Sequence, residues 1–152
     1  LGYHPAFALP FDDRHTTEDY EIRFDGLESP LCVSAVPNGL LNGQSYYLAR
    51  NVEAIQLTDD LFDNDSHAMV NLRSAHVSVI EKDTGRSVIC DVSDFPYTLI
   101  WSAPKKPLHF ICIEPWYGRA DAADFDGNLQ KRAWQNELEP GKIFEKAYTI
   151  AF

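Results

Sequence analysis

The chain has 152 residues, enough for one domain with a hydrophobic core. Its formal charge of −10 disfavours nucleic acid and anionic membranes as partners, since both are polyanions. No run of about 18 apolar residues predicts a membrane span, and the amino end lacks the pattern of a secretory signal. Aromatic residues make up 12 % of the chain, a content that favours strands and sugar-binding clefts.

The three cysteines are an odd number, are widely spaced, and each lies in an apolar run; they are Cys32, Cys90 and Cys112. This pattern predicts buried free thiols in a reducing compartment rather than a disulfide framework or a metal-binding knuckle. We therefore expect a cytoplasmic protein with no metal ligands among its site residues.

Short strands separated by turn signals dominate the first third of the chain. Residues 1–19 are predicted to be irregular, because prolines and a polar run interrupt any period. Apolar or alternating runs then predict strands at Tyr20–Phe24, Leu31–Val36 and Glu53–Thr58. Pro37-Asn38-Gly39 is a strong turn signal.

An acidic segment follows, with four aspartates within the seven positions from Asp59 to Asp65. The pattern of a calcium loop fails, because its sixth position is Asn64 instead of glycine and its twelfth is Val70 instead of glutamate. A solvated acidic loop is the simpler interpretation. Within it we single out Asp65, because a short carboxylate between two strands can bind paired sugar hydroxyls.

The second half of the chain predicts more strands. A hairpin joins Ala75–Glu81 to Arg86–Val92, with Gly85 able to adopt a positive φ in the turn. Only about Ala122 to Arg132 is expected to be helical or irregular. Further strands are predicted at Thr98–Trp101, His109–Ile113 and Phe144–Phe152. Roughly nine or ten strands without a long helix indicate an all-β, antiparallel β-sandwich.

The stretch from His109 to Asp121 carries the strongest functional signal. Its apolar strand is predicted to end at Glu114, because Pro115 cannot donate a ladder hydrogen bond. Trp116 and Tyr117 follow directly. A carboxylate at the tip of a buried strand, beside two large rings, suits a general base that faces a sugar. The alternative is a surface glutamate beside ordinary core aromatics.

Several motifs together resemble one family. They are GYHPAF at 2–7, the loop from Phe62 to Asp65, DFPYTLIWS at 94–102, CIEPWYGRAD at 112–121, Lys131, and LEPG at 138–141. As a set they resemble the aldose 1-epimerase (galactose mutarotase-like) superfamily, in particular its LacX-like branch. The match runs over essentially all of residues 1–152 but covers only the C-terminal half of such an enzyme. The resemblance implies a supersandwich fold whose N-terminal half is absent from this chain.

The resemblance also implies roles for residues at matching positions. Glu114 takes the place of the general base, and His4 that of the general acid. Asp65 is the loosest match, to an aspartate that holds sugar hydroxyls. In this family an arginine and a second histidine that contact the substrate come from the N-terminal half, and this chain supplies neither. The resemblance implies no metal and no organic cofactor.

Other side chains are candidates for binding the sugar. Arg119 could hold a hydroxyl or an acidic substituent, and the alternative for it is a surface ion pair with Asp121. Four aromatic residues are candidates either for stacking on the apolar face of a pyranose or for the core: Trp116, Tyr117, Trp101 and Tyr97.

The implied reaction interconverts the α and β anomers of a hexose. The base removes the proton of the C1 hydroxyl, the acid protonates the ring oxygen, and the ring opens and recloses. Two alternatives stay open: a carbohydrate-binding β-sandwich without turnover, and a sugar-phosphate mutarotase, which would need clustered Arg or Lys. We further predict that the missing N-terminal half is a partner, either as a second chain or as a lost segment.

Overall fold

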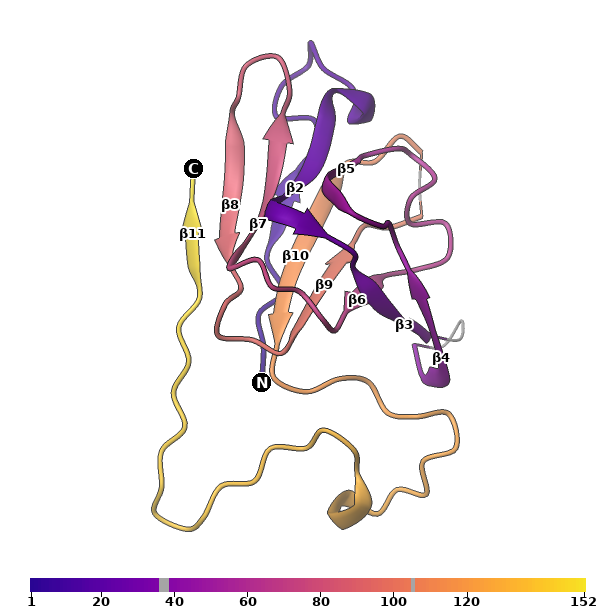
Figure 1. Ribbon diagram of the computed structural model, residues 1–152, viewed down its shortest axis with the longest axis vertical. Coiled ribbons are helices and arrows are strands. Elements are labelled where there is room, and N and C mark those ends of the chain that lie inside the picture. Colours follow the sequence, from indigo (N-terminus) through magenta and orange to yellow (C-terminus); the bar gives the residue numbers. More distant parts are fainter. Residues whose placement is uncertain (36–38, 105) are drawn as a thin grey trace.

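Two antiparallel sheets pack face to face in the computed structural model, which describes residues 1–35, 39–104 and 106–152. This arrangement confirms the predicted all-β sandwich (Figure 1). The first sheet has six strands in the order β1-β10-β9-β6-β3-β4. Their bounds are β1 Ala6–Ala8, β10 Phe110–Trp116, β9 Tyr97–Trp101, β6 His67–Met69, β3 Leu31–Ala35 and β4 Leu41–Tyr47.

The second sheet has five strands in the order β11-β8-β7-β2-β5. Its centre is the predicted hairpin of β7 and β8, whose turn places Gly85 at a φ of 75°. The bounds are β11 Thr149–Ala151, β8 Ser87–Asp91, β7 His76–Glu81, β2 Tyr20–Glu28 and β5 Val52–Gln56.

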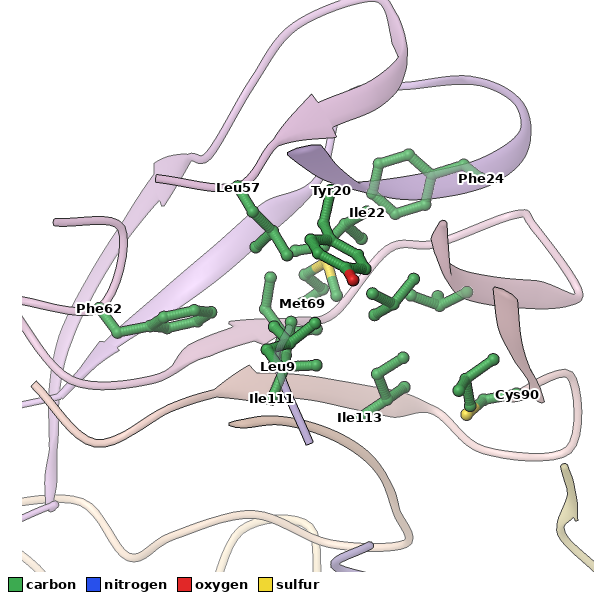
Figure 2. Packing of buried hydrophobic residues seen from close by; sticks show 14 of the residues in the cluster. Leu9, Tyr20, Ile22, Phe24, Leu57, Phe62, Met69, Cys90, Ile111 and Ile113 are labelled. Atoms are coloured by element: carbon green, nitrogen blue, oxygen red, sulfur yellow. The ribbon is translucent and has the colours of Figure 1, made fainter. Parts of the chain in front are cut away.

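The core lies between the sheets because alternate residues of each strand point inward. Figure 2 shows Ile111 and Ile113 of β10 directed toward Tyr20 and Ile22 of β2. All four side chains are fully buried. The inward face of β10 therefore belongs to the core. Cys112 and Glu114, which alternate with these isoleucines, point to the opposite face of the first sheet.

Three strands were not predicted, and the reasons are local. β1 lies within a segment expected to be irregular, and it is held by pairing with β10 rather than by its own pattern. β4 is an edge strand whose side chains after Leu41 are exposed, so it shows no alternation. β6 has only three residues. The predicted turn at 37–38 and Lys105 lie outside the described residues.

The prediction that the central strand ends at Glu114 was wrong, because β10 continues through Pro115 to Trp116. Pro115 lacks an N–H, yet its carbonyl accepts a hydrogen bond from the Tyr3 N–H at 3.1 Å. The Trp116 indole N–H donates to the Tyr3 carbonyl at 3.2 Å. The indole thus takes the place of the donor that proline cannot supply.

The final part of the chain also differs from its prediction. The long strand expected at 144–152 is only β11, and within 122–132 the structure has one 3-10 turn, η2, Leu129–Lys131. A second 3-10 turn, η1, spans Thr17–Asp19. Neither these turns nor any other helix of the described ranges has the length and hydropathy needed to cross a membrane. Residues 117–148 instead form a long connection between β10 and β11 that contains no strand (Figure 1).

Candidate active site

Strand pairing brings His4 and Glu114 together, although they are far apart in sequence. The register of β1 on β10 pairs Ala6 with Cys112, and an isolated bridge pairs Gly2 with Trp116. The same antiparallel register places position 4 opposite position 114. Their side chains are in contact, with His4 Nε2 at 3.3 Å from Glu114 Oε1.

The two side chains differ sharply in exposure. The Glu114 side chain is 2 % exposed, whereas that of His4 is 57 % exposed. Glu114 lies on the face of β10 opposite Ile111 and Ile113, so it is buried outside the main core. His4 therefore stands between the carboxyl group and solvent.

Burial has a direct effect on the carboxyl group. It raises the pKa of Glu114 to about 7, and a hydrogen bond from Trp116 offsets part of that rise. A glutamate with such a pKa exists in both protonation states near neutral pH. This property suits a group that alternately accepts and returns a proton.

Aromatic rings form one wall of this pair. The His4 ring meets Trp101 edge to face, with centroids 6.0 Å apart and an interplanar angle of 85°. Trp101 in turn contacts Phe110, with centroids 5.5 Å apart. Because β9 and β10 are neighbours, the rings share the outer face of the first sheet with Glu114. Trp101, a candidate for stacking on a sugar or for the core, thus lies beside His4.

Two hollows adjoin the pair. The larger, of about 500 Å³, is lined by His4, Trp116, Tyr117 and Arg119 among others. The predicted acid thus shares one hollow with three of the predicted sugar-binding residues. Glu114 does not line this hollow and reaches it only past His4.

Asp65 lies in the second hollow, of about 170 Å³, and not with His4. Trp116 and Arg119 line both hollows, so they are the link between them. Asp65 has a φ of 78°, and its Oδ1 accepts a hydrogen bond from the Ser66 N–H at 2.7 Å. Its other carboxylate oxygen has no hydrogen-bond partner within the described parts of the chain and can accept from a ligand.

Tyr97 also lines the second hollow. It is only 3 % exposed, and its hydroxyl has no hydrogen-bond partner among the residues that the structure describes. A buried hydroxyl without a partner is costly unless a ligand or water satisfies it. Sequence reasoning considered Tyr97 for stacking or for the core, and nothing in the sequence signals that its hydroxyl is unpaired.

Arg119 does not form the ion pair with Asp121 that was considered as its alternative role. Arg132 pairs with Asp121 instead, and it also donates to the Arg119 carbonyl at 2.7 Å. The Arg119 guanidinium lies over the Trp134 ring at 5.1 Å. Arg132, which also lines the larger hollow, is a site residue that sequence reasoning missed.

Tyr117 packs mainly against the C-terminal part of the chain. Its ring meets Phe144 with centroids 5.1 Å apart and Phe95 at 5.7 Å. Lys146 Nζ lies 5.0 Å from the ring centroid. One edge of Tyr117 lines the larger hollow, while most of its contacts hold residues 117–148 against the sandwich.

A second cluster of titratable groups lies away from this site. Asp12, His15 and Glu81 bring their ligand atoms within 4.8 Å of one another. Arg86 is already there, with its Nη2 donating to Glu81 at 2.7 Å and to Asp12 at 2.6 Å. The guanidinium bridges the two carboxylates, so this cluster is a structural ion-pair network.

Comparisons with known proteins agree with the fold. No protein-family model matches the sequence. Among solved structures, a galactose mutarotase related enzyme from Lactobacillus acidophilus superposes with a TM-score of 0.82 at 31 % identity. A galactose mutarotase-like protein from Lactobacillus casei ATCC 334 superposes with a TM-score of 0.75 at 28 % identity. The fold is thus that of a galactose mutarotase-like β-sandwich.

The sequence comparison identifies similar proteins as well. The plasmid and chromosomal forms of Protein LacX from Lactococcus lactis subsp. lactis are each 29 % identical to this chain over 152 residues. The match includes 99 % of this chain and 50 % of either LacX protein. For the two solved structures the covered share is 48 % and 50 %. The predicted LacX-like resemblance is therefore confirmed, and the chain spans about half the length of these relatives.

Proposed function

We propose that this chain carries the acid and base of an aldose 1-epimerase-like isomerase that interconverts the anomers of a hexose. The observation that carries the proposal is the contact of the His4 imidazole with the buried Glu114 carboxyl group, whose pKa is raised to about 7 by burial. The similarity to galactose mutarotase-related proteins supports the same class of reaction.

The reaction needs two proton transfers, one at each of the two oxygen atoms bonded to C1. Ionised Glu114 removes the proton of the C1 hydroxyl while His4 donates a proton to the ring oxygen, and the C1–ring oxygen bond breaks to give the open aldehyde. Rotation about C1–C2 and the reverse transfers close the ring on the other face. Every proton is returned, so the reaction needs no metal and no organic cofactor.

The close contact restricts how the sugar binds. A separation of 3.3 Å leaves no room for a pyranose ring between the two groups. The C1 hydroxyl oxygen and the ring oxygen are both bonded to C1, so a sugar can present them to neighbouring groups from one side. Because His4 covers Glu114, the imidazole must turn aside to admit the C1 hydroxyl, and its 57 % exposure permits that rotation.

The neighbouring hollows supply the rest of the proposed binding site. Trp116 and Tyr117 offer apolar ring surface in the hollow that His4 lines, and Arg119 offers donors for sugar hydroxyls. Asp65 and the unpaired Tyr97 hydroxyl offer further hydrogen bonds from the second hollow. A hexose bound across Trp116 would contact residues of both hollows.

The rate of anomer exchange should depend on the ionisation of Glu114. Because burial raises the pKa of this base to about 7, we expect the rate to fall as the pH drops below that value and Glu114 becomes protonated. Polarimetry of α-glucose or α-galactose solutions between about pH 5 and pH 8 measures this, after subtraction of the uncatalysed rate. A catalysed rate that rises toward acid would contradict the assignment of Glu114 as the base.

Gly2 is expected to be needed for the contact between the pair. An added Cβ would lie 2.6 Å from Trp116 Cδ1 and 2.9 Å from the Pro115 carbonyl oxygen, so alanine would push the amino end off β10. Since a misplacement of about 1 Å can cost 10²-fold in rate, we expect Gly2→Ala to slow the reaction at least about tenfold. Gly26→Ala is the control, because nothing lies within 4 Å of its Cβ. Equal rates in the two variants would contradict this expectation.

We also propose that a second polypeptide segment completes the site and supplies an arginine and a histidine. The matched relatives are about twice as long as this chain. Several large apolar side chains are exposed: Leu1, Trp134, Leu138, Ile143 and Phe152. Intact-mass analysis with size-exclusion chromatography tests this proposal. A stable, monodisperse monomer of 17.2 kDa would count against it.

A carbohydrate-binding sandwich without turnover is the second candidate, and the burial of Glu114 beneath His4 favours it. Polarimetry separates the two, because unchanged equilibration kinetics with added protein would leave only binding. The sugar-phosphate alternative gains no support, since Lys106 pairs with Asp63 at 3.1 Å and Arg119 stacks on Trp134.

We propose a cytoplasmic location because all three cysteines are free and buried.

A further inference from the structure

We propose that His4, Cys112 and Glu114 form a binding site for Zn²⁺. Their ligand atoms, an imidazole nitrogen, a thiol sulfur and a carboxylate oxygen, all lie within 4.8 Å of one another. Sequence reasoning treated Cys112 only as a buried thiol and named no metal ligands. The structure places that thiol beside the candidate acid and base.

The sheet geometry explains why these three groups converge. Cys112 and Glu114 are two residues apart on β10, so their side chains point to the same face. The pairing of Ala6 with Cys112 brings the amino-terminal segment alongside, and His4 projects over Glu114. Two of the three ligands are thus held in a rigid central strand.

The three donors are suited to one kind of metal ion. Zn²⁺ binds thiolate, imidazole and carboxylate at about 2.0–2.3 Å, commonly with three protein ligands and one water. Mg²⁺ and Ca²⁺ prefer sites made of oxygen, so a site with sulfur and nitrogen disfavours them. The exposed His4 side chain can move the short distance that tetrahedral coordination requires.

The immediate surroundings fit a bound cation. Cys112 is 1 % exposed, and its sulfur forms no disulfide and no hydrogen bond within the described ranges. A metal ion would replace the thiol proton, which passes to solvent. The side of the cluster covered by His4 is the one that faces solvent, so an ion can enter there and keep a water ligand.

Bound Zn²⁺ would inhibit anomer exchange, and this consequence rests on the proposed function. The ion would occupy the Nε2 lone pair of His4 and an oxygen of Glu114, the two groups that are proposed to exchange protons with the sugar. Binding itself does not depend on catalysis. It can therefore be tested even if the protein proves to have no isomerase activity.

Isothermal titration calorimetry with Zn²⁺ alone tests the site, in a buffer that does not bind the metal. We expect one saturable site in the wild-type protein and none with Mg²⁺. Cys112→Ser and His4→Ala should each weaken Zn²⁺ binding at least about 100-fold, because the loss of even an outer-shell partner costs 10–100-fold. Since His4 is largely exposed, its replacement tests the site without disturbing the core.

Two variants serve as matched controls. Cys90→Ser removes another buried free thiol, one that belongs to no potential metal-ligand group in the described parts of the chain. His15→Ala removes the imidazole of the Asp12, His15 and Glu81 cluster, the only other potential metal-ligand group among the described residues. Both controls should bind Zn²⁺ as the wild type does.

Substitution with Co²⁺ gives an independent signal, because a thiolate bound to cobalt produces a charge-transfer absorption band. This band should appear in the wild type and in Cys90→Ser, and disappear in Cys112→Ser. The proposal is overturned if the wild type shows no saturable Zn²⁺ binding. It is equally overturned if binding persists in His4→Ala, or is lost in His15→Ala but not in His4→Ala.

Discussion

Glu114→Gln is expected to reduce the catalysed rate of anomer exchange by about 10²–10⁴-fold, the usual contribution of a general base. The amide keeps the shape of the side chain but cannot accept the proton of the C1 hydroxyl. Polarimetry of freshly dissolved α-glucose or α-galactose measures the effect. The exposed Glu139→Gln is the control and should retain the wild-type rate.

The same substitution should not weaken the fold. Burial raises the pKa of Glu114 to about 7, so the wild-type protein loses stability as the pH rises from about 4.5 to 7 and the carboxyl group ionises. A neutral glutamine does not carry this penalty. Urea unfolding above pH 7 should therefore show Glu114→Gln to be at least as stable as the wild type. A variant less stable than the wild type above pH 7 would contradict the penalty assigned to burial of Glu114, and one that keeps the wild-type rate would contradict its role as the base.

Arg86→Ala is expected to lower the free energy of unfolding, because it removes the guanidinium that donates to the buried Glu81 carboxylate. Arg86 donates to both oxygens of Glu81, from Nε at 2.8 Å and from Nη2 at 2.7 Å. Glu81 is 0 % exposed. Urea denaturation at pH 7 measures the loss.

Arg14→Ala is the matched control for this prediction. Arg14 also pairs with Asp12, at 3.1 Å, but its side chain is 77 % exposed, so its loss should change stability by no more than about 0.5 kcal/mol. Equal effects of the two substitutions would contradict the view that burial of Glu81 makes Arg86 important.

The pH dependence of stability offers a second test of the same network. Burial raises the pKa of Glu81, but hydrogen bonds from Thr84, Tyr20 and Arg86 outweigh it and lower the pKa from 4.5 to about 2. The stabilisation from this group is complete above pH 4.5 and is lost as the pH falls toward 2. In Arg86→Ala this acid-dependent loss should be smaller.

Much of the fold could be predicted from local patterns. Alternating residues predicted β2 and the hairpin of β7 and β8, because these strands bury one face in the core. β1 and β4 escaped prediction because pairing with a neighbour holds them, and their own residues show no clear alternation. β10 continues through Pro115 because Pro115 and Trp116 pair with Thr98 and Tyr97 of β9, a long-range contact that no local rule includes.

The candidate site was predictable in its residues but not in its arrangement. A carboxylate after an apolar run predicted Glu114, and the resemblance pointed to His4. Their contact at 3.3 Å depends on the register between β1 and β10, which the sequence does not specify. The separation of Asp65 into a second hollow depends on how β6 and β9 pair, which is likewise a long-range feature.

A crystal structure of the protein with a bound hexose tests the central claim most directly. We expect the His4 side chain to turn aside, with the C1 hydroxyl hydrogen-bonded to Glu114 and the ring oxygen within reach of His4 Nε2. The Trp116 ring should lie against the apolar face of the sugar. A hexose bound only by Asp65 and Tyr97, with His4 still covering Glu114, would contradict the proposed acid–base pair.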